Sequence, residues 1–240
     1  MKKITSLIIV FSMLVAMLAC FDVSTAFAAT NGNCGANFGG TNAKWSLNTS
    51  TGVLTISGKG ATKDCGNVGS NQAPWKDSRN KNKSIVVEDG ITALGRYMFY
   101  KCEVAESVSL PSTLTAIGDT KFLEYGTFVD CKALTNVTLP SKLQTIGHAA
   151  FKGCSSLKSI KIPDSVTTIG TSAFEDCKAL STVTFGTGVK VTGNMAFRNS
   201  GVSKVKFSSS ITEISPWSFY GCMFVNLEIP ESVNKISIRS

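Results

Sequence analysis

The chain has 240 residues and a formal net charge of +8 at pH 7, and 43% of its residues are hydrophobic. This length can bury a substantial core as one domain, or as one repetitive array with a cap. No apolar stretch after the first thirty residues approaches the roughly 20 residues of a membrane-spanning helix, which excludes a transmembrane span in that part.

The first 28 residues are typical of a secretory signal peptide. Lys2 and Lys3 form a short positive region, residues 4–19 are almost wholly apolar, and Ala26-Phe27-Ala28 places small residues at a cleavage site. We therefore expect cleavage after Ala28 and a protein that is secreted or retained at the cell surface. A minor alternative is a lipoprotein attached through Cys20, because Met17-Leu18-Ala19-Cys20 resembles a lipoprotein cleavage box.

Export removes Lys2, Lys3 and Asp22, so the mature chain carries 22 basic and 15 acidic residues, a formal charge of +7. This balance favours acidic partners such as anionic wall polymers or acidic glycans, or it simply keeps the protein soluble.

A repeat dominates the rest of the chain. Phenylalanine recurs at 99, 128, 151, 174, 197 and 219, with intervals of 29, 23, 23, 23 and 22 residues. A second column follows three residues after each phenylalanine and consists of Cys102, Cys131, Cys154, Cys177, Ser200 and Cys222. A third column, an isoleucine-glycine-like pair, precedes each phenylalanine, as in Ile146-Gly147 and Ile169-Gly170. Chance cannot plausibly align these columns over six units.

Each part of a unit has a physical interpretation. Ile160-Lys161-Ile162 alternates apolar and polar residues, which predicts a short strand with two side chains inside. Pro163 cannot donate to a ladder and ends the strand. Gly170 allows a turn, and Phe174 and Cys177 fill the interior corner. Because no unit can bury its apolar set alone, the units must stack into a solenoid.

The pattern resembles the BspA-like, or Treponema-type, leucine-rich repeats of bacterial surface proteins. The matching motif is Leu134…Val137-Thr138-Leu139-Pro140…Leu143…Ile146-Gly147…Ala150-Phe151…Cys154, and the resemblance covers about 82–240. It implies a curved solenoid with a parallel β ribbon on the concave face and little helix, in a secreted or surface protein that binds host or microbial partners. A parallel β-helix is the alternative architecture.

Residues 29–81 differ in composition. Trp45–Leu47 and Val53–Ser57 flank a turn-forming stretch and predict a β-hairpin. We expect an N-terminal cap at 29–81, because an array needs a shielded end. Residues 82–240 then form an α/β-type repeat solenoid of six repeats and a partial one.

The cysteines fall into two groups. The repeat column needs a small apolar residue, so its cysteines are expected to be free, buried thiols. Cys34 and Cys65 stand apart in the cap, and we expect a disulfide between them.

The residues favour no catalytic chemistry. His148 is the single histidine, so a serine triad or a histidine-rich metal site is hard to assemble, and we interpret it as a solvated turn residue. Carboxylate pairs such as Glu175-Asp176 fall at repeat turns, where such side chains are normally just solvated. We therefore expect no enzyme, no cofactor and no metal.

A ligand would sit on the outward residues of the parallel strands. The expected site residues, Thr138, Lys158, Lys161, Thr184, Lys204, Lys206 and Glu228, form a small, polar, lysine-containing surface. It lacks the aromatic stripe of a sugar- or base-stacking platform. This favours a protein or an anionic polymer over specific nucleic acid, although ordinary solvated strand positions would look the same.

One unit carries six extra residues near Asp119–Glu124, including Phe122 and Leu123 and followed by Tyr125. Such an insertion forms a binding loop or folds back over its neighbour. The sequence as a whole predicts a monomeric, non-enzymatic binding or adhesion module. The alternative is a structural element of the cell envelope.

Overall fold

The computed structural model describes residues 30–66, 68–121 and 126–240. The expected signal peptide at 1–28, with Cys20, and the loop residues Phe122, Leu123 and Tyr125 lie outside these residues.

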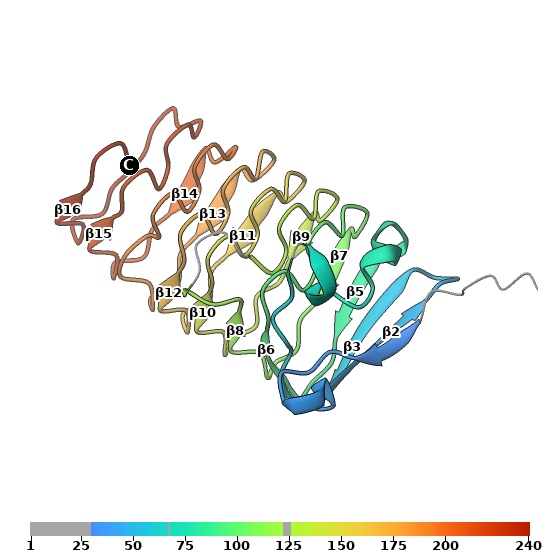
Figure 1. Ribbon diagram of the computed structural model, residues 1–240. Helices are drawn as coiled ribbons and strands as arrows, with labels where there is room; N and C mark the ends of the chain where they lie inside the picture. The colour runs from blue at the N-terminus through green and yellow to red at the C-terminus, as the bar shows by residue number, and fades with distance from the viewer. Residues whose placement is uncertain (1–29, 67, 122–125) are drawn as a thin grey trace, which may run out of the picture.

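Successive coils of the chain stack side by side, and most of them contribute a short strand to a ladder that runs along the molecule and is parallel after its N-terminal hairpin (Figure 1). The first part of this ladder is a six-stranded sheet in the order β1-β2-β3-β5-β7-β9, and a three-stranded sheet, β11-β13-β14, follows. The strands are β1 (Asn31–Asn33), β2 (Ala43–Asn48), β3 (Val53–Gly58), β5 (Ser84–Val87), β7 (Ser107–Ser109), β9 (Asn136–Val137), β11 (Ser159–Lys161), β13 (Thr182–Thr184) and β14 (Lys204–Lys206).

A second parallel ladder lies on the returning side of the coils (Figure 1). It comprises β4 (Gly60–Ala61), β6 (Ile91–Leu94), β8 (Ala116–Ile117), β10 (Thr145–Ile146) and β12 (Thr168–Ile169), and separately β15 (Glu213–Ile214) with β16 (Lys235–Ile236). The sequence predicted one ribbon only, because strands of mostly two residues are too short to show a period of two.

The N-terminal hairpin is confirmed, since β2 and β3 pair antiparallel with Asn48 opposite Val53. However, β3 also pairs parallel with β5, with Leu54 opposite Ile85. The Trp75 ring stacks on Phe99 at 5.8 Å between centroids. Coil stacking therefore begins inside the segment that the sequence assigned to a cap.

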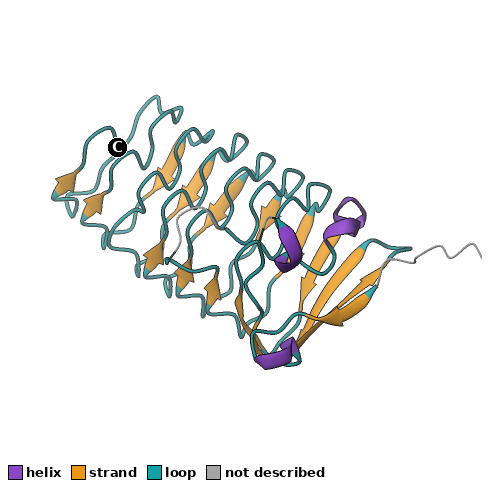
Figure 2. Ribbon diagram, in the orientation of Figure 1, coloured by secondary structure: helices purple, strands orange, loops and turns teal. Residues whose placement is uncertain are grey.

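Helix is confined, in the described part of the chain, to short 3-10 turns near the N-terminal end (Figure 2). These are η1 (Phe38–Gly40), η2 (Gly69–Asn71) and η3 (Lys76–Lys81). The prediction of a strand-rich array with little helix is confirmed.

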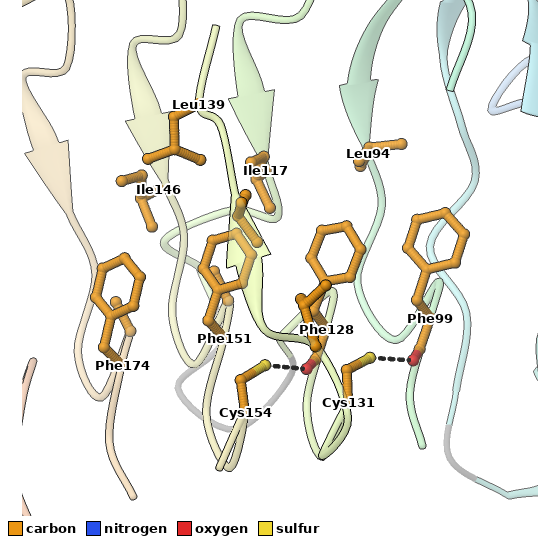
Figure 3. Packing of buried hydrophobic residues seen from close by; sticks show 14 of the residues in the cluster. Leu94, Phe99, Ile117, Phe128, Cys131, Leu139, Ile146, Phe151, Cys154 and Phe174 are labelled. Atoms are coloured by element: carbon orange, nitrogen blue, oxygen red, sulfur yellow. Dashed lines mark hydrogen bonds between the residues drawn. The ribbon is translucent and has the colours of Figure 1, made fainter. Parts of the chain in front are cut away.

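The phenylalanines form one internal row (Figure 3). The Phe151 ring lies 5.2 Å from Phe128 and 5.3 Å from Phe174, with interplanar angles of 3° and 5°. The row continues at similar spacing to Phe99, Phe197 and Phe219. Because this spacing is close to the distance between paired strands, one ring per coil fills the interior without gaps.

The column cysteines are free, and the thiols of Cys131, Cys154, Cys177 and Cys222 donate to a backbone carbonyl of an earlier coil. The Sγ of Cys131 donates to the carbonyl of Phe99 at 3.1 Å, and that of Cys154 donates to Phe128 at 3.2 Å (Figure 3). Burial raises the pKa of Cys102 to about 11 and raises that of Cys154 well above 9.0. These thiols therefore stay protonated and serve the packing.

The glycine that follows each column isoleucine has a reason other than the expected turn. A Cβ on Gly170 would lie 2.4 Å from the backbone N of His148, and one on Gly147 would lie 2.5 Å from that of Asp119. Neither glycine needs a positive φ, whereas Gly118 has a φ of 70°. Close approach of adjacent coils requires these glycines, and the interpretation of Gly170 as a turn residue is corrected accordingly.

Left-handed backbone flanks the phenylalanine row. Ala149 and Gly153, two residues before and after Phe151, have φ values of 49° and 72°. Ser172 and Asp176 take the same conformation around Phe174. Two tight bends per coil thus hold each ring at its corner, at a cost in strain for the residues other than glycine.

Candidate binding face

The outward side chains of the first ladder form two aligned columns, which we call the strand face. One contains Ser107, Asn136, Ser159, Thr182 and Lys204, and the other contains Ser109, Thr138, Lys161, Thr184 and Lys206. Asn226 and Glu228 occupy the corresponding sequence positions of the last coil, at which the described structure forms no strand. The register is direct in the middle of the array, where Lys161 lies opposite Thr184 and Thr184 opposite Lys206. The inward partners Ile160 and Val183 are buried, so the alternation predicted for these strands is confirmed.

The lysines of this face project from a polar, hydroxyl-rich surface. Lys158, Lys161, Lys204 and Lys206 are all exposed. No ion pair holds any of them among the residues that the structure describes. Their ammonium groups are therefore available to an anionic group of a partner.

A hollow of about 760 Å³ opens between β9 and β11, and we call it the seam hollow. It is lined by Asn136, Val137, Thr138, Leu139, Ser141, Ser159, Lys161, Pro163 and Asp164. The expected site residues Thr138 and Lys161 thus come together on its two sides.

A second hollow, of about 390 Å³, lies where β14 meets the last coil. Lys206 and Glu228 both line it, next to Phe207 and Pro230. Thr184 lies between the two hollows on the intact sheet, and Lys158 and Lys204 line neither of them. Four of the seven expected residues therefore meet in pairs, and three do not.

Asp164 carries the one carboxylate of the seam hollow. Its Oδ1 accepts a hydrogen bond from the backbone N–H of Thr187 at 2.8 Å, and these contacts with Thr187 lower the pKa of Asp164. Lys161 contributes less to this shift. Asp164 is thus ionised at neutral pH and already hydrogen-bonded to Thr187. Lys161 has no ion-pair partner among the described residues.

His148 bridges three coils. The backbone N–H of Thr171 donates to its Nδ1 at 2.7 Å, so Nε2 carries the proton and donates to the carbonyl of Thr120 at 2.8 Å. His148 lies in a turn, as expected, but its ring is hydrogen-bonded to both neighbouring coils and is not merely solvated.

The environment of Glu175 also differs from what the sequence indicated. Only 5% of its surface is exposed, and Lys152 Nζ lies 2.9 Å from its Oε2. It is a structural ion pair between adjacent coils, not a free carboxylate at a turn.

Cys34 and Cys65 are two separate, buried thiols in the structure. Burial raises their pKa values to about 12 and about 11, and Cys65 also raises the pKa of Cys34, as expected for neighbouring groups. Their proximity keeps the disulfide as a prediction for an oxidising compartment.

Sequence reasoning missed the contributions of Ser141 and Asp164 to the seam hollow. Asp164 follows Pro163 directly, and a proline-acid turn at the end of an outward-facing strand is the signal that could have indicated it. The opening of the sheet has no such signal, because Val137 and Leu139 alternate in the same way as Ile160 and Ile162.

No helix among the described residues is long and apolar enough to cross a membrane. The same part of the chain holds no group of three or more His, Cys, Asp and Glu side chains placed to bind a metal ion.

Three solved structures share the fold. A leucine-rich repeat protein from Bacteroides ovatus is 21% identical, with a TM-score of 0.54 over 80% of this chain and 58% of that protein. A leucine-rich repeat protein of T. pallidum is 22% identical, with a TM-score of 0.53 over 74% of this chain and 85% of that one. A leucine-rich repeat protein from Eubacterium ventriosum is 24% identical, with a TM-score of 0.52 over 87% of this chain and 68% of that protein.

The chain thus spans little more than half of the first of these structures. No curated protein sequence matches it significantly. The family model for the BspA type leucine rich repeat region matches residues 77–127 and 121–240, in six copies. Leucine-rich repeats of this kind are typically non-enzymatic binding modules. The stacked coils, the phenylalanine row and this match agree, and the chain belongs to the BspA-type leucine-rich repeat family.

Proposed function

We propose that this chain is a secreted or cell-surface, non-enzymatic binding and adhesion module whose strand face holds an extracellular protein or an anionic polymer. The observation that carries the proposal is the strand face itself: aligned hydroxyl and lysine positions over several coils, with a hollow at each end of its central part. The signal-peptide pattern at 1–28 supports an extracellular location.

Charge reversal on the strand face tests the proposal. The mature chain 29–240 with Lys161→Glu and Lys206→Glu is compared with the unaltered chain for binding to mucin, heparin and whole cells. The matched control, Lys59→Glu with Lys190→Glu, makes the same charge change away from the strand face. We expect binding to fall by at least about tenfold for the first pair only. Equal binding by all three proteins would overturn the proposal.

An envelope-assembly role is the second candidate, and the last coil favours it. Met223, Val225 and Ile238 expose 69%, 92% and 78% of their surfaces, and exposed apolar groups of this kind favour association. Sedimentation of the mature chain separates the two roles: the binding-module proposal expects a monomer, and assembly expects concentration-dependent oligomers that Val225→Glu abolishes.

A further inference from the structure

The seam hollow exists because the first ladder is interrupted between β9 and β11. Asn136 pairs with Ser107 on one side, and Ser159 pairs with Thr182 on the other. Among the described strands no pairing joins β9 to β11.

The interruption is local, since the second ladder runs unbroken through β8, β10 and β12. The rings of Phe128 and Phe151 also remain stacked across the same two coils at 5.2 Å. Lys158 N–H still donates to the carbonyl of Thr135 at 3.1 Å. The coils therefore remain bonded where the strand face begins, and the pairing is lost only beyond that point, over residues 136–139 and 159–162.

The opening leaves a backbone donor and a backbone acceptor beside the hollow. In the next two coils Ile162 N–H donates to the carbonyl of Thr184 at 2.8 Å, and Phe185 N–H donates to that of Lys206 at 2.9 Å. The equivalent bond from Leu139 N–H to the carbonyl of Lys161 is not formed in the described structure, and neither is the one from Leu110 N–H to the carbonyl of Thr138 one coil earlier. Backbone groups of this kind require a partner, either water or a ligand.

The lining of the hollow indicates the chemistry of that ligand. Val137, Leu139 and Pro163 provide an apolar floor, and neutral hydrogen-bonding side chains surround it. The volume lies within the range of about 300–1,000 Å³ that is usual for ligand sites. Lys161 adds a cation without an ion-pair partner among the described residues, because Asp164 is already bonded to Thr187.

These features favour a peptide over an anionic polymer. An amide offers both an N–H and a C=O, which match the free carbonyl and the free N–H, whereas a polyphosphate or sulfated glycan offers mainly acceptors. Extended peptides commonly bind through main-chain bonds to unpaired strand edges, with pockets for alternate side chains.

We propose that the seam between β9 and β11 binds an extended, acidic peptide segment of a protein partner. The main chain of the segment bonds to Leu139 N–H and the Lys161 carbonyl, a small side chain packs on Val137 and Pro163, and a carboxylate pairs with Lys161. This inference rests on the proposed function and narrows its partner to a protein.

The test uses substitutions that fill the hollow or remove its positive charge. Thr138→Trp places a large ring in it, and its control Thr167→Trp makes the same change at an exposed threonine away from the strand face and from both hollows. Lys161→Met removes the cation, and the control Lys190→Met removes an exposed cation away from the strand face. Because Thr138 and Lys161 are exposed, neither change opens the core, and equal urea midpoints would verify folding.

The probe is an acetylated, amidated hexapeptide of alternating alanine and aspartate, with the dissociation constant measured by calorimetry on the mature chain. We expect Thr138→Trp and Lys161→Met each to weaken binding by at least about tenfold, and the two controls by less than about twofold. The amide signal of Leu139 should shift on titration in a 15N-labelled sample.

Two further probes identify the chemistry. The same hexapeptide with N-methylated amides keeps its charge but loses its donors, and should bind at least about tenfold more weakly. Polyphosphate of equal charge should not respond to Thr138→Trp.

Three results would overturn the inference: no binding of the hexapeptide at millimolar concentration, equal binding to the Thr138→Trp protein, or tighter binding of polyphosphate in the hollow. If charge reversal at Lys161 and Lys206 abolishes adhesion while Thr138→Trp leaves it intact, the strand face binds its partner elsewhere. That result would refute only the peptide site at the seam and would leave the proposed function unaffected.

Discussion

Truncation of Phe151 to alanine should destabilise the whole array. Its ring is fully buried and lies between Phe128 at 5.2 Å and Phe174 at 5.3 Å. Loss of the ring removes contacts with both neighbouring coils and leaves a cavity that stacked backbones cannot easily close. A cost of about 3–5 kcal/mol is typical of such a truncation. Phe151→Leu, which keeps most of the volume, should cost about 1–1.5 kcal/mol.

Urea unfolding followed by tryptophan fluorescence measures this cost. Trp75 is buried near the first coils, and Trp217 lies near the last, so the spectrum reports on both ends of the array. Tyr220→Ala, at a side chain that is 46% exposed, provides the control and should cost less than about 1 kcal/mol. If Phe151→Ala lowered the free energy of unfolding no more than Tyr220→Ala does, the phenylalanine row would not hold the coils together.

Three shorter predictions follow from the same packing. Burial raises the pKa of Cys154 in the folded chain above its ordinary 9.0, so the stability due to this thiol is complete below pH 9 and is lost as the pH rises. Urea midpoints should fall between pH 9 and 10 because the other buried thiols act in the same direction, and Cys154→Ala should remove a part of that fall equivalent to about 1 kcal/mol. Gly170→Ala should lower the free energy of unfolding by about 1–3 kcal/mol, because its Cβ would lie 2.4 Å from the backbone N of His148; an unchanged melting temperature would contradict the close-approach argument. Exported protein should contain a Cys34–Cys65 disulfide, seen as a loss of two hydrogens in the linked peptides, and a mass that assigns the bond to another pair would refute it.

Periodicity made the interior of each coil predictable. One phenylalanine, one small residue and one glycine per unit repeat with little variation, because every coil must match the cross-section of its neighbours. Phe174, Cys177 and Gly170 could therefore be placed from the sequence, although the reason for Gly170 emerged only from the distance to the next coil.

The details of backbone pairing could not be predicted in the same way. The second ladder rests on strands such as Thr145–Ile146, which are too short to carry a pattern. The interruption after β9 leaves the inward residues Val137 and Leu139 buried, so the hydrophobic pattern is the same whether the sheet is closed or open. Ala149 likewise gives no sign of its left-handed φ of 49°, since alanine is uncommon in that region.

The division between interior and strand face bears on how such an array acquires a binding site. An outward residue such as Thr184 contacts solvent and its neighbours in the column, and nothing in the core depends on it. A large change such as Thr184→Trp should therefore alter the surface at little cost in stability. Phe151 has no such freedom, because two coils rest on its ring. Recognition can then reside in the side chains of the strand face and in the places where adjacent strands part, while the stacked interior remains the same from coil to coil. The binding site proposed at the seam, where Thr138 and Lys161 meet, therefore requires no departure from the repeat in the core.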